Sequence, residues 1–302
     1  MSPVSVAAIV PTLDRPDWLE RSLAALAAAS PAFAEIWVAD QSAGEQGRRL
    51  CERCGARWLH LDRRGISYAR NAALPHVTAD WVAFPDDDAE VAPDVIAQLR
   101  GTLERHPDVA FVGAHVTFPD GRPMQPGMDR RARALESPPD VLRTTVSPGL
   151  FVRRDWIARA GGFDERFGVG APFPSGEESD LLFAILRAGG AGRYEPSIHV
   201  RHPDPFAIRD ENACRQRMAD YGEGLGALLA KHSQERSGDV YLALYRRLVR
   251  RALLGCAAMT LSGRFAQAQR FAASYRGRRA GWRRWFAREA APATPRSIRA
   301  AR

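Results

Sequence analysis

Three consecutive carboxylates, Asp86, Asp87 and Asp88, follow the apolar run 81–84. This run predicts a short buried strand, and Pro85 closes it because proline cannot donate a hydrogen bond within a sheet. Ligands of open α/β sheets bind where strands end, and adjacent carboxylates repel one another unless a divalent cation such as Mg²⁺ or Mn²⁺ binds their oxygens. The segment therefore indicates either a metal site that can hold a diphosphate or a solvated acidic turn.

A second group of acids, Glu177, Glu178 and Asp180, lies at the head of a helical pattern at 181–188. Carboxylates in the first turn of a helix stabilise it by capping backbone amides and by complementing the helix dipole. One of these acids could instead point into a cleft and act as a general base. The residues by themselves leave both interpretations open.

The elements that position these acids follow an alternating pattern. Apolar runs predict four strands in the first ninety residues, at 6–10, 35–40, 57–61 and 81–84, with helical patterns between them. Polar residues follow every strand, namely Thr12, Asp40, Asp62 or Arg64, and the three aspartates. A strand, a helix and a second strand form a parallel pair, and a parallel sheet brings such strand ends to one edge. We therefore expect a Rossmann-like α/β fold, with a mixed, mainly parallel sheet flanked by helices and a nucleotide-sized crevice.

Patterns after residue 90 are less regular. They predict helices at 93–105 and 154–160 and strands at 109–118 and 145–153. Residues 119–146 are rich in proline, glycine and arginine, so we expect a long loop there. Gly161 and Gly162 end the second of these helices.

The composition is that of an ordinary globular protein of 302 residues, with 45% hydrophobic and 26% charged residues. The apolar stretch 4–10 lacks the basic start of a signal peptide, and 252–261 is about half as long as a membrane-spanning helix. Four cysteines, with Cys51 and Cys54 forming a lone CxxC, favour a reduced cytoplasmic protein over a zinc-binding one.

Basic charge is concentrated in the C-terminal tail. Residues 241–302 contain fifteen arginines and one acid, Glu289, so they carry +14, and residues 1–240 sum to −6 within a total of +8. Helical spacing at 241–258 places four arginines on one arc and apolar residues opposite. The tail is therefore either a packed helical region with its arginines in water or a surface that attaches to an anionic membrane at its inner face. A nucleic-acid partner is not expected, because the first 240 residues are acidic and carry no nucleic-acid-binding motif.

Six segments, in their order and spacing, resemble the family 2 glycosyltransferases, which have the GT-A fold. The segments are VPTLDR at 10–15, VADQS at 38–42, ARN at 69–71, FPDDD at 84–88, GGFDE at 161–165 and GEESDL at 176–181. The resemblance covers residues 4 to about 205, so we expect 1–205 to form a nucleotide-sugar glycosyltransferase domain. Residues 206–302 lie outside it and would form a basic helical C-terminal region.

The resemblance implies a nucleotide-diphosphate sugar donor and a divalent metal, Mg²⁺ or Mn²⁺. By position, the donor would be bound by Pro11, Thr12, Leu13, Asp40, Gly65, Arg70, Asn71, Asp86 and Asp87. Among these, Pro11, Thr12 and Asp40 would hold the base and ribose, and Arg70 would lie near the base or the diphosphate.

The resemblance also implies a DxD-like metal motif. Asp88 is the favoured ligand, because it belongs both to the spaced pair with Asp86 and to the adjacent pair with Asp87. His202 would complete the metal shell, and His199 competes with it.

Catalysis and acceptor binding are assigned in the same way. The acid after Gly176-Glu177 is usually Asp in this family, and here it is Glu178, which becomes the first choice for the base, with Glu177 and Asp180 as alternatives. The acceptor side would be shaped by Gly162, Phe163 and Asp164.

The resemblance thus implies transfer of a sugar with inversion, in which the base takes a proton from an acceptor hydroxyl as its oxygen attacks the anomeric carbon. The metal would offset the charge on the leaving diphosphate. We expect a glycan or lipid-linked acceptor and a role in bacterial-type cell-surface polysaccharide or glycolipid synthesis. The alternatives are a non-catalytic sugar-nucleotide-binding protein and, through the basic tail, a nucleic-acid-binding protein.

Overall fold

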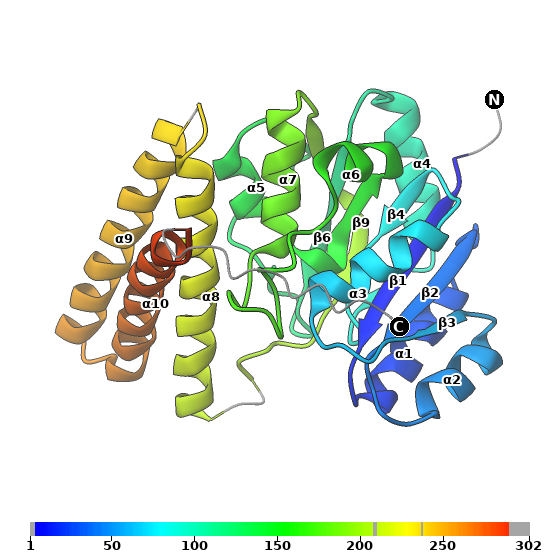
Figure 1. The fold of residues 1–302 in the computed structure, drawn as a ribbon, viewed down its shortest axis with the longest axis horizontal. Helices are drawn as coiled ribbons and strands as arrows, with labels where there is room; N and C mark the ends of the chain where they lie inside the picture. Colours follow the sequence, from blue (N-terminus) through cyan, green and yellow to red (C-terminus); the bar gives the residue numbers. More distant parts are fainter. Residues whose placement is uncertain (1–3, 208–209, 237, 290–302) are drawn as a thin grey trace, which may run out of the picture. The chain divides into compact units, whose positions relative to one another are not determined.

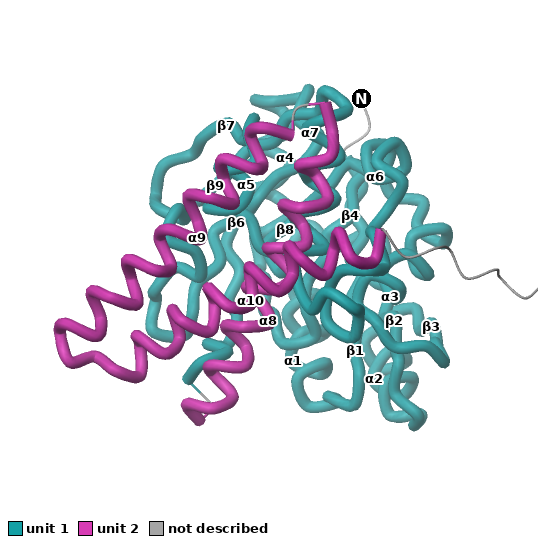
Figure 2. The backbone as a smooth tube through the Cα atoms, turned by 60° about the vertical axis from the view of Figure 1, so that its left-hand side comes forward, with its two compact units in different colours: residues 1–209 teal, residues 210–302 magenta. Residues whose placement is uncertain are grey.

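A computed structural model of the protein describes residues 4–207, 210–236 and 238–289. The chain divides into two compact units, residues 1–209 and 210–302, which Figure 2 draws in teal and magenta. We refer to them as unit 1 and unit 2. Residues 290–302, the end of the predicted basic tail, lie outside the described residues.

Unit 1 is built on a nine-stranded sheet with helices between its strands (Figure 1). Its strands are β1 Val6–Thr12, β2 Glu35–Asp40, β3 Arg57–His60, β4 Trp81–Ala83, β5 Glu90–Val91, β6 Phe111–Thr117, β7 Arg133–Leu135, β8 Leu150–Arg153 and β9 Gly192–Arg201. Its α-helices are α1 Pro16–Ala27, α2 Gln46–Cys54, α3 Ile66–Ala73, α4 Val95–Arg105, α5 Pro138–Thr144, α6 Arg154–Ala160 and α7 Glu177–Arg187.

The sheet is mixed and mainly parallel, as predicted. Its strand order is β3-β2-β1-β4-β8-β6-β9-β5, and β7 also pairs with β9. The first four strands in this order are parallel to one another, and β8 is antiparallel to both of its neighbours, β4 and β6. Because β9 is parallel to β6, the strands β1, β4 and β9 all run in the same direction and end at the same edge of the sheet.

Local sequence explains the elements that form this edge. All seven residues of β1 are buried, as expected for a central parallel strand covered on both faces. The helix α1 begins with Pro16 in its first turn, where a missing amide donor costs nothing, and it buries Leu19, Leu23 and Leu26.

The segment between β6 and α6 differs from the predicted loop. The strand β7 and the helix α5 lie within residues 119–146, where the many polar and proline residues obscured the periodicity. The strand β8 is also shorter than predicted, because Ser147–Gly149 form a 3₁₀ turn around Pro148. The two-residue strand β5 is too short to leave a sequence pattern.

The described residues of unit 2 form three long helices, α8 Glu211–Ser233, α9 Gly238–Leu261 and α10 Phe265–Glu289. The helices α8 and α10 pack closely at glycines, since a Cβ atom at Gly226 would lie 2.1 Å from the carbonyl oxygen of Arg278 and one at Gly281 would lie 1.9 Å from that of Glu223. Among the described residues, no helix is both long enough and apolar enough to span a membrane.

Candidate active site

The carboxyl ends of β4 and β9 bring together residues that are more than a hundred positions apart in sequence. Asp86 and Asp88 follow β4, and His202 follows β9. One atom from each of these three side chains lies within 4.8 Å of the others, a grouping that could hold a metal ion. Two carboxylates and an imidazole form a donor set suited to a divalent cation such as Mn²⁺.

The imidazole of His202 is oriented for this role. Its Nδ1 lies 2.7 Å from the carbonyl oxygen of Pro203, to which it can donate, so Nε2 faces the acids at 3.0 Å from Asp88 and 3.7 Å from Asp86. Burial opposes a charge on the ring, but hydrogen bonds to Asp86 and Asp88 outweigh it and raise the pKa of His202 to about 10. The acids thus attract positive charge to Nε2, the place where a cation would bind. The competing His199 packs its ring against His115 instead.

The middle aspartate has different partners. Asp87 is buried, accepts a hydrogen bond from Thr12 at 2.8 Å and pairs with Arg15 at 2.6 Å. Burial raises the pKa of Asp87 to about 7 against the opposing effects of Arg15 and Thr12. Burial also opposes the charge on Asp88, but His202 and Arg15 lower the pKa of Asp88 to about 2. The structure therefore groups the spaced pair, Asp86 and Asp88, and turns Asp87 toward β1.

Arg70 on α3 joins the metal-site acids to the acids of α7. Its side chain is fully buried, with Nη1 3.1 Å from Glu177 and Nη2 3.2 Å from Asp86. Nη2 also donates to the hydroxyl of Ser147. The guanidinium lies over the ring of Phe163, with 5.3 Å from Cζ to the ring centroid. Arg70 is therefore a buried bridge between two carboxylates, and its place near the base or the diphosphate stays a prediction.

The three acids of α7 have distinct surroundings. Glu177 and Asp180 are buried, and Glu177 is held by Arg70. Glu178 retains partial exposure. Burial and the charge of Glu177 raise the pKa of Glu178 to about 8, Arg70 opposes this shift, and Asp86 adds to it. Glu178 therefore lies within electrostatic range of the same carboxylate that belongs to the metal group.

A cavity of about 230 Å³ opens beside the ends of β1 and β2. Residues from these ends line it, among them Thr12, Asp14, Arg15, Asp40, Ser42 and Gly47. Both oxygens of Asp40 already have donors, the backbone amide of Ser42 at 2.9 Å and the indole of Trp58 at 3.0 Å. A Cβ atom at Gly47 would lie 2.0 Å from Asp40, so only glycine leaves room for this carboxylate.

Residues assigned to the acceptor side form a second hydrogen-bonded segment. The carboxamide of Asn71 donates to the carbonyl of Phe163 at 2.8 Å and accepts from its amide at 2.9 Å. Gly162 has φ 78°, a left-handed conformation that favours glycine, and Asp164 pairs with Arg166. Asn71, expected at the nucleotide sugar, is thus engaged with the backbone of the acceptor-side segment.

The remaining predicted donor residues lie on the same side of the sheet. Pro11 is the second-last residue of β1, and Leu13 directly follows the end of the strand. The amide of Gly65, at the start of α3, donates to the side chain of Gln41 at 2.6 Å, just beyond the end of β2.

Three residues of this region did not emerge from sequence reasoning as site residues. Arg15 neutralises two aspartates, Ser147 accepts from Arg70, and Trp58 donates to Asp40. Only Arg15 could have been selected from the sequence, because it lies in the polar segment directly after the first predicted strand. Ser147 and Trp58 reach their partners through the tertiary fold.

Comparison with known proteins gives a family match. The sequence pattern described as glycosyl transferase family 2 matches residues 7–159. The succinoglycan biosynthesis protein ExoM of Rhizobium meliloti (strain 1021) is 29% identical over 247 residues, which cover 77% of this chain and 78% of that protein. The pre-mycofactocin glycosyltransferase of Mycobacterium tuberculosis is 28% identical over 57% of this chain and 37% of that protein.

Solved structures share the fold at low sequence identity. Residues 1–349 of TarS from S. aureus superpose with a TM-score of 0.55 and 16% identity, covering 93% of this chain and 92% of that one. The mannosyltransferase PcManGT from Pyrobaculum calidifontis, solved in complex with GDP-Man and Mn²⁺, gives a TM-score of 0.60 and 17% identity over 90% of this chain and 86% of that one. The arrangement of sheet and helices in this chain is therefore that of the GT-A glycosyltransferases.

Proposed function

The chain belongs to glycosyl transferase family 2 and is a glycosyltransferase, and from this premise we propose that it transfers a sugar from a nucleotide-diphosphate sugar to an acceptor hydroxyl with inversion. We propose Mg²⁺ or Mn²⁺ as the metal and a glycan or lipid-linked molecule as the acceptor. The related ExoM is named for succinoglycan biosynthesis, which supports a role for this chain in cell-surface polysaccharide or glycolipid synthesis.

One observation carries the proposal. A single buried guanidinium, that of Arg70, pairs with Asp86 of the metal group and with Glu177 of the α7 acids. Buried charges of this kind are retained only when they are paired, so the bridge fixes the two acidic groups relative to each other. Glu178 directly follows Glu177 on α7 and senses the charges of both Arg70 and Asp86. Such a fixed separation is what a displacement reaction requires of its base and its leaving group.

Asp86, Asp88 and His202 would hold the metal. Their oxygen and nitrogen donors fit it, and the hydrogen bond from His202 to Pro203 supplies the outer support common at imidazole ligands. Bound there, the metal would act as a Lewis acid that offsets negative charge on the leaving diphosphate. The mannosyltransferase neighbour that was solved with GDP-Man and Mn²⁺ supports this chemistry.

Glu178 is the proposed general base. Glu177 is engaged with Arg70, and Asp180 is buried, whereas Glu178 keeps part of its surface accessible to an acceptor. A carboxyl with a raised pKa accepts a proton more readily once it is ionised, which matches the task of removing a hydroxyl proton. Thr12 and Arg15 would hold Asp87 in place beside the donor, and the cavity beside Thr12 and Asp40 would take the nucleoside.

We further propose that 1–205 is the catalytic domain and that 206–302 is a separate basic helical region. The cysteines of the described chain are free thiols, which fits a cytoplasmic enzyme.

Turnover of candidate donors tests the activity. UDP-, GDP- and dTDP-sugars are incubated with the full chain and Mn²⁺ or Mg²⁺, and release of the nucleoside diphosphate is measured. We expect one donor to be hydrolysed slowly without acceptor, and hydrolysis to stop on addition of a chelator. Saturable binding of a donor without any release, with or without acceptor glycans, would instead identify a non-catalytic sugar-nucleotide-binding protein.

A further inference from the structure

The outward face of α9 changes character along its length. Arg246 and Arg250 lie one turn apart, and Leu254 and Leu261 continue the same stripe at helical spacing. All four are exposed. Leu254 is 59% exposed and Leu261 is 90% exposed, values that are unusual for leucines in a helix of a globular unit. The helix therefore carries an exposed face that is basic first and apolar toward its end.

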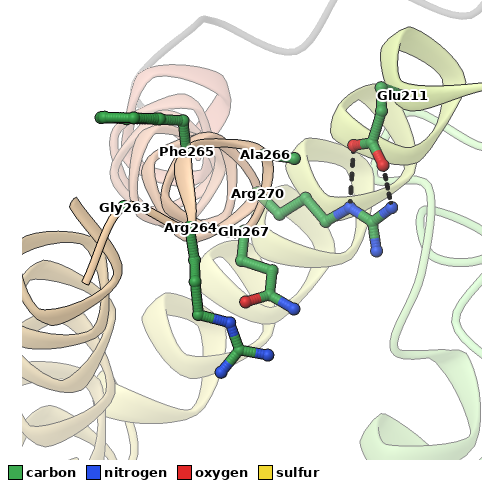
Figure 3. Close-up of a pocket in the computed structure, with 7 residues that line it drawn as sticks. All are labelled: Glu211, Gly263, Arg264, Phe265, Ala266, Gln267 and Arg270. Carbon is green, nitrogen blue, oxygen red and sulfur yellow. Dashed lines mark hydrogen bonds and ion pairs between the residues drawn. The ribbon is translucent and has the colours of Figure 1, made fainter.

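The turn from α9 to α10 extends this apolar end. Phe265, the first residue of α10, is 63% exposed. An open cavity of about 500 Å³ lies beside it, lined by residues of the turn and by Glu211 and Arg270, which pair with each other. Figure 3 shows Arg264 and Gln267 extending to one side of the turn and the ring of Phe265 to another. We call Arg250, Leu254, Leu261, Arg264 and Phe265 the hairpin tip.

Two groups of arginines in unit 2 differ in their partners. Arg270 and Arg284 pair with acids of α8, and the buried Arg278 donates to the carbonyl of Leu248. By contrast, the arginines of the exposed α9 face and of the turn have no acidic partner anywhere in the described part of the chain, namely Arg246, Arg247, Arg250, Arg251 and Arg264. This second group leaves an exposed positive charge that no acid of the described residues neutralises and that is available to an anionic partner.

We propose that the hairpin tip docks on an anionic phospholipid surface, with Leu261 and Phe265 entering the interface and the unpaired arginines contacting lipid phosphates. Helices bind such surfaces by inserting apolar side chains at the interface while flanking arginines contact the anionic head groups. A second copy of this chain is a poor occupant, because two tips facing each other would bring the unpaired Arg250 and Arg264 of each copy together. Double-stranded nucleic acid would engage the arginines but would leave Leu261 and Phe265 in water.

Neither donor nor acceptor takes part in the proposed docking, so binding can be measured without them. The full chain is sedimented with vesicles of phosphatidylcholine alone and with vesicles that also contain phosphatidylglycerol. We expect binding to the anionic vesicles only. The double variant Leu261→Ser/Phe265→Ser should lose about tenfold or more of this binding, and Arg250→Gln/Arg264→Gln about tenfold to thirtyfold at low salt.

Val240→Ser is the matched control. Val240 is 49% exposed on the same helix but lies 21 residues before Leu261, about 30 Å away along the axis. Its substitution should leave vesicle binding unchanged. Because all substituted side chains are exposed, the variants should unfold at the same temperature as the parent chain, which separates lost docking from lost folding.

A second measurement does not depend on loss of binding. Phe265→Trp should gain fluorescence quenching by anionic vesicles with brominated acyl chains, beyond the quenching of the parent chain. Equal sedimentation of the parent and both double variants, or no added quenching at position 265, would overturn the proposal. If the parent chain formed dimers and Leu261→Ser/Phe265→Ser made it monomeric, the proposal would be overturned in favour of self-association. Failure of docking would leave donor turnover intact, so the two proposals fail separately.

Discussion

The sheet edge of unit 1 and the outward face of α9 in unit 2 both gather charge, but they hold it in opposite ways. At the sheet edge, Asp86 and Asp88 are matched by Arg70, Arg15 and His202 within hydrogen-bonding or ion-pair distance. On α9, consecutive pairs of arginines face outward with no acid opposite them within the described residues.

The difference follows from burial. A charge removed from water is costly unless a partner lies close by, so the buried residues at the sheet edge are fixed in position by one another. Exposed arginines need no partner and keep many conformations. The first region is thus preorganised for one reaction geometry, whereas the second can adapt to a surface whose charges are not fixed. Substitutions in both regions test this difference, and they are given from the largest expected effect to the smallest.

Replacement of Asp88 by Asn should have the largest effect on turnover. It removes a charge that faces both His202 and Arg15, and it replaces one of the three proposed metal ligands by a weaker, neutral amide oxygen. We expect donor turnover to fall by about a thousandfold or more, and Mn²⁺ binding measured by calorimetry to weaken. The matched control is Asp62→Asn, because the side chain of Asp62 is fully exposed. Retention of turnover by Asp88→Asn would remove the metal group from the mechanism.

Glu178→Gln should lower turnover by about a hundredfold to ten-thousandfold, the usual contribution of a general base. Since burial and Glu177 raise the pKa of Glu178 to about 8, the parent rate should rise with pH across neutrality as the carboxyl ionises, and the variant should lack this rise. Glu104→Gln, at an exposed position, serves as the control. An identical pH profile for the parent and Glu178→Gln would transfer the role of base to Glu177 or Asp180.

The same shift predicts how stability depends on pH. A carboxyl whose pKa is higher in the folded chain than in the unfolded chain favours folding while it is protonated, and this contribution is lost as pH rises from about 4.5 toward 8. Glu178→Gln cannot ionise, so its stability relative to the parent should increase with pH over that window. Urea denaturation at several pH values measures the difference.

Arg70→Met should destabilise unit 1 by about 3–5 kcal/mol, because it leaves Glu177 and Asp86 without their shared partner in the interior. Arg48→Met is the contrasting substitution. Arg48 forms ion pairs with Glu45 and Glu52 in solvent, and its loss should leave stability unchanged. Urea denaturation measures the free energy of unfolding of both variants. Equal stability of Arg70→Met and Arg48→Met would contradict a structural role for the buried bridge.

A pair of glycine substitutions should give the smallest effects, with opposite signs. Gly281→Ala adds a methyl group where Glu223 of α8 leaves no space, so we expect a loss of about 1–3 kcal/mol in unit 2. Gly101→Ala, within α4 of unit 1, meets no atom within 4 Å and should stabilise the chain by about 0.5–1 kcal/mol. Thermal unfolding monitored by circular dichroism checks both, and stabilisation by Gly281→Ala would contradict the close packing of α8 and α10.

Sequence patterns were most informative where an element is regular and buried. The fully buried strand β1 and the helix α1, with its apolar stripe, gave clear signals, and so did residues 241–258 within α9. The helix α5 and the strands β5 and β7 gave none, because they are short and their pairing partner or packing surface comes from distant parts of the chain.

The predicted site residues also differ in whether local sequence or distant neighbours determine their place. Residue type and position at a strand end were enough to select the group Asp86 to Asp88 as a metal-site candidate, whereas His202 was selected only through the family resemblance; the direction of the strands brings these ends together. The partners of Arg70 and Asn71 were not predictable, since Glu177, Ser147 and Phe163 follow them by more than 70 residues and even Asp86 reaches Arg70 only through the fold.

The sequence by itself determined which residues could carry the chemistry, the alternation of strands and helices, and the concentration of arginine in the C-terminal tail. These features are local, and local periodicity and residue type encode them. Only the tertiary structure decided that Asp87 turns away from the metal group, that Arg70 bridges Asp86 and Glu177, and which arginines of unit 2 lack a partner. The reason is that the energy of a buried charge depends on what lies within a few ångströms of it, and folding brings those neighbours from far along the chain.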